Sequence, residues 1–182
     1  MEVITPLNSS SSEYLKVKQN FTTKMASKFN IQVHSIIRVE MPKHINQNHE
    51  AYKKNNLHRG CVQYFHGTKH ICDLKNLNNS KICANEACCV CNIIRTGFRL
   101  KNGRVWFSPD AWYSHGYTNV GIDSSRAMFI IDVVGASYSS DSEYNVGYAE
   151  LDNTLDCVLD ATDGIGQAWE IVDDDAEESL EE

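Results

Sequence analysis

The sequence of 182 residues predicts a single α+β domain, and three segments indicate this fold class. Apolar residues recur at spacings of three and four from Tyr14 to Phe29, which is the pattern of one helix face and predicts a helix from about Ser12 to Phe29. Residues 31–40 are rich in β-branched side chains and alternate in part between apolar and polar, which predicts a strand. Residues 126–134 form a near-continuous apolar run, which suits the centre of a buried sheet.

The remaining elements are predicted in chain order. Residues 1–12, which include a run of four serines, are expected to be disordered. A polar segment that begins at Pro42 is expected to form a short helix ending near Asn56. Residues 90–96 predict a further short helix, for which Gly97 is the expected C-cap. Short strands are expected at residues 61–65, 103–107, 148–152 and 169–172, and a helix or turn at residues 110–117.

The net charge of −7 is unevenly distributed along the chain. Residues 1–101 contain fifteen Lys and Arg against six acids, whereas residues 102–182 contain two against eighteen. Residues 173–182 are expected to be a solvated acidic tail, which leaves residues 13–172 for the domain. A basic first half can attract nucleic acid or the pyrophosphate of a dinucleotide. The alternative, which we favour, is that the two halves pair their charges within one fold.

The sequence also bears on location. It contains no run of eighteen apolar residues, so no membrane span is expected. No apolar secretory segment precedes the first residues, which favours a reducing, intracellular location in the cytoplasm or nucleus.

Five of the seven cysteines fall between Cys72 and Cys91. The spacing Cys83-x4-Cys88-x2-Cys91, with Cys72 upstream, places four thiols where a small loop can fold around one ion, and the Cys-x2-Cys pair is typical of tetrahedral zinc. Four thiolates leave no open coordination position, so such a zinc would be structural. Disulfides and reduced, partly buried thiols are the alternatives. Three cysteines stand outside this set: Cys89 as a spare, and Cys61 and Cys157 as ordinary buried residues.

A buried strand leads into His66-Gly67-Thr68. A glycine at the end of a strand lets a ligand approach the backbone, and a histidine beside it can offer ring N–H groups to hydroxyls. On its own this tripeptide also suits a strand-end histidine with no ligand. Downstream, Trp112, Tyr113, His115 and Tyr117 form either a flat wall for a planar ligand or a small aromatic core cluster.

These motifs occur in a defined order: His66-Gly67-Thr68, the four cysteines, Ile93-Ile94-x-x-Gly97-Phe98, and Gly103-Arg104-Val105-Trp106-Phe107 with Ser114 and Tyr117. Together they resemble the catalytic domain of poly(ADP-ribose) polymerases (PARPs), in particular a fungal and plant branch with a cysteine cluster after the His-Gly-Thr motif. The resemblance extends from about Tyr14 to Ala176. It implies an ADP-ribosyltransferase fold of split antiparallel sheets with flanking helices and a small zinc-bound loop, and NAD as substrate.

The resemblance also implies roles for individual residues. His66 matches the histidine that holds the adenosine-side ribose of NAD, and Gly67 matches the glycine whose backbone binds the nicotinamide amide. Ser114 matches the serine that binds the carboxamide, and Tyr117 the tyrosine that stacks on the nicotinamide ring. The expected NAD-binding set is completed by the adjacent Thr68 and Tyr113.

Two positions depart from the family's His-Tyr-Glu triad. Trp106 takes the place of the tyrosine, and a gap-free match puts Ala168 on the glutamate position. Glu170 serves as the catalytic carboxylate only if the chain shifts by two residues, which keeps a strand residue on the same face. These departures favour mono- over poly-ADP-ribosylation of a protein or nucleic-acid acceptor. The alternative is an inactive PARP-like module that binds NAD or ADP-ribose, nucleic acid or a protein partner.

Overall fold

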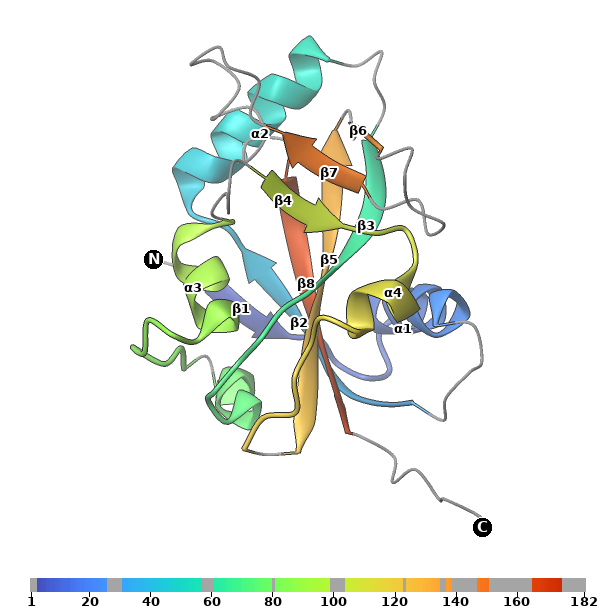
Figure 1. Cartoon of the computed structure of the whole chain (residues 1–182), viewed down its shortest axis with the longest axis vertical. Coiled ribbons are helices and arrows are strands. Elements are labelled where there is room, and N and C mark those ends of the chain that lie inside the picture. The colour runs from blue at the N-terminus through green and yellow to red at the C-terminus, as the bar shows by residue number, and fades with distance from the viewer. Residues whose placement is uncertain are drawn as a thin grey trace.

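The computed structural model describes residues 3–25, 31–56, 61–79, 81–98, 104–122, 124–134, 137–138, 147–150 and 165–174. Within these ranges the strands form two antiparallel sheets, and helices pack beside them, so the fold is α+β as predicted (Figure 1). The five-stranded sheet has the order β1 (Val3–Pro6), β2 (Gln32–Glu40), β8 (Ile165–Asp174), β5 (Ser125–Val134), β3 (Cys61–Gly67). The three-stranded sheet has the order β4 (Arg104–Phe107), β7 (Gly147–Glu150), β6 (Ser137–Tyr138).

The helices of the described chain lie between these strands in sequence. They are α1 (Ser12–Lys24), α2 (Lys43–Asn55), the 3-10 helix η2 (Leu74–Asn79), α3 (Cys89–Thr96) and α4 (Ala111–His115). The predicted helix starts are confirmed within one residue for α1, α2 and α3, but α1 ends at Lys24 rather than near Phe29 as predicted. None of these helices is long and apolar enough to cross a membrane.

The five-stranded sheet buries apolar residues on both of its faces. One core combines strand residues such as Ile37, Tyr64 and Phe129 with residues from η2, α3 and β4. The other combines Phe65 and Ile130 with the apolar faces of α1 and α4. Accordingly, α3 lies on one side of the sheet and α1 and α4 lie on the other (Figure 1). Each core removes apolar surface from water, so both faces stabilise the sheet.

Local sequence explains where α1 begins. The Ser11 hydroxyl accepts a hydrogen bond from the Tyr14 N–H (3.1 Å), which satisfies one of the free donors of the first turn. Tyr14 and Phe21 then point into the core beneath the helix, at 6% and 1% exposure. The predicted helical stripe is therefore a packing face.

The structure corrects two of the predicted boundaries. Residues 1–12 were expected to be disordered, but Val3–Pro6 pair with β2, and Ile4 is buried. The β-branched residues of this segment form a strand because β2 offers them an open edge. The acidic tail was expected from residue 173, but Asp173 and Asp174 continue β8 and pair with β2. The rest of the predicted tail lies outside the described residues.

One cysteine prediction is also wrong. Cys61, expected to be buried, opens β3 at the edge of the sheet and is exposed. Cys157 lies outside the described residues.

Candidate functional site

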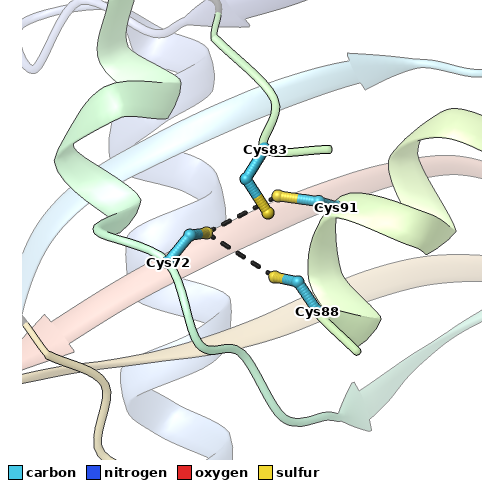
Figure 2. A group of neighbouring side chains, drawn as sticks. All are labelled: Cys72, Cys83, Cys88 and Cys91. Carbon is cyan, nitrogen blue, oxygen red and sulfur yellow. Dashed lines mark hydrogen bonds between the residues drawn. The ribbon is translucent and has the colours of Figure 1, made fainter. Parts of the chain in front are cut away.

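Four cysteine side chains converge beside the sheet. The sulfur atoms of Cys72, Cys83, Cys88 and Cys91 all lie within 4.8 Å of one another (Figure 2). The Cys72 sulfur is 3.6 Å from that of Cys88 and 3.5 Å from that of Cys91. A tetrahedral zinc with Zn–S bonds of about 2.3 Å separates its sulfurs by about 3.8 Å, so the spacing suits that ion. The same distances are far longer than a disulfide bond, and the four cysteines are free.

The ligands come from three neighbouring segments. Cys72 follows the end of β3, Cys83 lies in the loop after η2, Cys88 is the N-cap residue of α3, and Cys91 lies in its first turn. Cys88 and Cys91 are fully buried, and the other two are partly buried. Cys89 is exposed and stands outside the cluster, as the sequence predicted. These four thiols could hold a metal ion, and together they would fill all four positions of a tetrahedral coordination sphere.

The loop that carries Cys83 is held by α3. The Arg95 guanidinium donates to the backbone carbonyl of Cys83 and, at 2.8 Å, to the side-chain oxygen of Asn92. Asn92 in turn donates to the backbone carbonyl of Glu86. Hydrogen bonds from residues that do not bind the metal orient the residues that do. In addition to its cysteines, α3 therefore contributes Arg95 and Asn92, which hold the loop between Cys83 and Cys88.

The thiols of the cluster differ in acidity. Burial works to raise the pKa of Cys88, but hydrogen bonds involving the backbone of Cys91 and Ile71 and the neighbouring thiols lower it to about 7. Burial raises the pKa of Cys72 to about 12 and raises the pKa of Cys91 as well. The Cys88 thiolate is thus favoured beside two thiols, Cys72 and Cys91, whose raised pKa keeps them protonated, and a dication would supply the charge needed to ionise those two.

His66 lies on the same side of the sheet as the cysteines, at the end of β3. Its Nδ1 is 2.6 Å from the backbone oxygen of Trp106, and its ring meets the ring of Phe98 edge-on, with centroids 5.0 Å apart. A carbonyl oxygen only accepts, so Nδ1 carries the proton. Although the residue keeps some exposed surface, its ring is closely surrounded by protein, and this burial lowers the pKa of His66. The neutral ring leaves Nε2 as an acceptor.

Gly67 and Ser114 form a close contact between β3 and α4. A Cβ at Gly67 would lie 1.8 Å from the carbonyl oxygen of Ser114, so glycine is needed for the two backbones to meet. The Ser114 hydroxyl is buried and donates to the backbone oxygen of Phe65 at 2.9 Å. The Asp110 carboxylate caps α4 through the N–H groups of Trp112 and Tyr113, which fixes the start of the helix.

The aromatic residues near this contact are unequally exposed. Trp106 on β4 and Tyr117 after α4 expose 46% and 57% of their surface. The hydroxyls of Tyr113 and Tyr117 lie 2.9 Å apart, and the rings of Trp112 and His115 stack at 5.8 Å. Thr68, next to Gly67, is buried at 8% exposure. The aromatic residues that were predicted to form either a ligand-binding wall or a core cluster are therefore only partly buried.

Strand register relates residue 170 to His66. In the five-stranded sheet Glu170 pairs with Phe129, and Phe129 pairs with His66. Cross-strand partners share a face, and two strand spacings amount to about 10 Å. Ala168 pairs with Ile131 and so belongs to a different row from His66. Of the two candidate glutamate positions, 170 is the one that shares the row of His66.

Some supporting residues have no signal in the sequence. The side chain of Asn119 accepts from the His70 N–H and donates to the His70 carbonyl, both at 2.8 Å, which ties the segment before Cys72 to the loop after α4. Asn119 and Arg95 act through partners distant in sequence or through the fold, which spacing alone does not reveal. Comparison of the sequence with models of protein families and with curated proteins finds no match.

Proposed function

We propose that the chain is an NAD-dependent mono-ADP-ribosyltransferase with an ADP-ribosyltransferase fold and a structural zinc. Its acceptor would be a protein or a nucleic acid. The observation that carries the proposal is the convergence of two segments distant in sequence, β4 and α4, on the end of β3. His66 contacts the backbone of Trp106, and Gly67 packs directly against Ser114. Four free thiols suit a reducing, intracellular compartment.

The chemistry of His66 supports a role in binding a sugar. The neutral ring donates from Nδ1 to the Trp106 backbone, so its orientation is fixed before a ligand arrives. Nε2 then accepts a hydrogen bond from a ribose hydroxyl of NAD. A charged imidazolium would lack this acceptor, so the lowered pKa suits the proposed role.

The backbone at Gly67 and the rings of Trp106 and Tyr117 suit a planar, uncharged amide such as nicotinamide. Aromatic rings that expose about half of their surface gain free energy when a flat ligand covers them. Gly67 offers its backbone without a side chain in the way. These groups would hold the nicotinamide end of NAD while the adenosine-side ribose lies toward His66.

A carboxylate at residue 170 would assist the reaction. When the bond between the nicotinamide nitrogen and the ribose C1′ breaks, its electron pair leaves with nicotinamide, and positive charge develops on the ribose. A fixed negative charge stabilises that transition state more than the ground state. The acceptor nucleophile then bonds to C1′ and gives up its proton. Residue 170 supports this role because it shares the row of His66.

Two observations favour a second function, an NAD-binding module without turnover. The Ser114 hydroxyl already donates to the Phe65 carbonyl, and a tryptophan stands where the resembled family has a tyrosine. A module of this kind would bind NAD but leave its glycosidic bond intact.

Labelled NAD distinguishes the two functions. Zinc-loaded protein is incubated with NAD labelled in the adenylate part, alone, with a cell lysate or with RNA, and transfer is followed on gels. A transferase labels an acceptor, and His66→Ala abolishes the label while His34→Ala, an exposed histidine on β2, does not. Binding of NAD with no label on any acceptor would favour the module.

A further inference from the structure

The metal centre and His66 are joined by two short paths through the chain. Cys72 is six residues beyond His66, on the segment that continues β3. Cys91 lies on α3, whose C-cap residue Gly97 leads directly into Phe98, seven residues after Cys91. The two paths also meet each other, because the Val90 N–H at the start of α3 donates to the Lys69 carbonyl at 3.3 Å.

Phe98 forms a wall beside the His66 ring. It is 6% exposed and meets the His66 ring edge-on at 5.0 Å and the Phe129 ring at 5.8 Å. With the Trp106 backbone on Nδ1, this contact fixes the orientation of the imidazole. It also contributes to the burial that keeps the ring neutral. Any displacement of Phe98 would loosen His66 and admit water to it.

The position of Phe98 depends on how α3 is anchored. The helix spans only eight residues, well below the length at which an isolated helix is stable in water. Its N-cap residue, Cys88, makes no side-chain capping hydrogen bond. Three apolar residues, Val90, Ile93 and Ile94, pack into the core, and the cysteine cluster fixes the first turn. A metal ion would lock that turn to the segment that continues β3.

We propose that metal binding at Cys72, Cys83, Cys88 and Cys91 controls the His66 site, with Phe98 as the positioning residue that carries the effect. This inference rests on the proposed function only for its consequence, the loss of NAD binding. Loss of the metal frees the first turn of α3, Phe98 moves away, and His66 loses its fixed orientation. The five-stranded sheet stays folded, because its second core, on the face of α1 and α4, contains no residue of the metal loop.

Nuclear magnetic resonance of the imidazole ring tests this coupling without requiring catalysis. The His66 ring signal is assigned by its absence in His66→Gln, and its pKa is followed in zinc-loaded protein, in chelated protein and in zinc-loaded Phe98→Leu. We expect a pKa below about 6.5 in the loaded protein and a return toward that value in the other two. Zinc content stays at one per chain in Phe98→Leu, and NAD binding weakens about tenfold or more. The matched control is Phe21→Leu, a core phenylalanine on the other face, which leaves His66 unchanged.

Two results would overturn the coupling. One is an unchanged His66 pKa in zinc-loaded Phe98→Leu. The other is unfolding of the whole five-stranded sheet on chelation. The metal would then be required for folding, and would have no separate effect on the His66 ring. The proposed function fails separately: His66 responds to zinc as expected, yet NAD neither binds nor reacts. Conversely, NAD turnover by a protein whose His66 pKa does not change on zinc removal would support the transferase and refute the coupling.

Discussion

Replacement of Gly67 by alanine tests the contact between β3 and α4. The added Cβ would lie 1.8 Å from the Ser114 carbonyl oxygen, and contacts under 3.0 Å essentially never occur for real Cβ atoms. The two backbones must therefore separate by at least 1.2 Å, the difference between these distances. The obstructing atom belongs to the backbone of α4, so a side-chain rotation cannot relieve the clash.

The free-energy cost follows from that displacement. A separation of this size along the Ser114–Phe65 hydrogen bond would lengthen it from 2.9 Å beyond hydrogen-bonding range. The buried bond contributes about 1 kcal/mol, and overpacking costs about 1–3 kcal/mol. We therefore expect Gly67→Ala to lower the free energy of unfolding by about 2–4 kcal/mol, and Tm by roughly 4–16 °C for a chain of this size.

Denaturant and thermal unfolding, followed by circular dichroism, measure the effect. The matched control is Gly116→Ala at the C-cap of the same helix, α4. There φ is −59°, and a Cβ would meet its nearest heavy atom, the Tyr113 backbone oxygen, at 3.4 Å. That variant should unfold within about 1 kcal/mol of the wild type. Equal stability of Gly67→Ala and the wild type would refute the close approach of β3 and α4.

Three further predictions concern the metal loop and His66. Arg95→Ala frees the Cys83 loop and should weaken zinc binding by about 10–100-fold in a competition titration. The control Lys75→Ala, which removes an exposed charge nearby, should leave zinc binding unchanged. Equal zinc affinities of the two variants would contradict the role of Arg95. Burial lowers the pKa of His66, so the neutral histidine contributes its full share of the free energy of unfolding above about pH 6.5, and this contribution is lost as the pH falls toward the folded pKa. The loss of stability at low pH should be smaller in His66→Gln. Identical curves of stability against pH for this variant and the wild type would contradict the prediction. Gly97→Ala should lower the free energy of unfolding by about 1–3 kcal/mol, because φ is +78° and ψ is −178° at this position. A variant as stable as the wild type would contradict that backbone geometry.

The sequence predicted best those features that depend on local spacing. The four cysteines fall within twenty residues, and their spacing predicted a cluster that the structure brings within 4.8 Å. The periodicity after Tyr14 predicted α1, and the apolar run before Val134 predicted β5. In each case one local pattern, of ligand spacing or of hydrophobicity, is sufficient to specify the element.

Features that depend on distant partners were missed. Val3–Pro6 form a strand because they pair with β2, and the run of serines after them misleads a reading based on composition. Asp173 and Asp174 have low strand propensity, yet β8 continues through them because it lies between β2 and β5. Phe98 reaches His66 only because Gly97 turns the chain at the end of α3. Sequence spacing cannot give such contacts.

NAD consumption by the purified, zinc-loaded protein decides whether the chain is a transferase. His66→Ala and Glu170→Gln are compared with Glu40→Gln, an exposed carboxylate on β2. We expect the wild type and Glu40→Gln to release nicotinamide, and both of the other variants to lose turnover. Turnover that survives His66→Ala, or a wild type that neither consumes nor binds NAD, would contradict the proposed function.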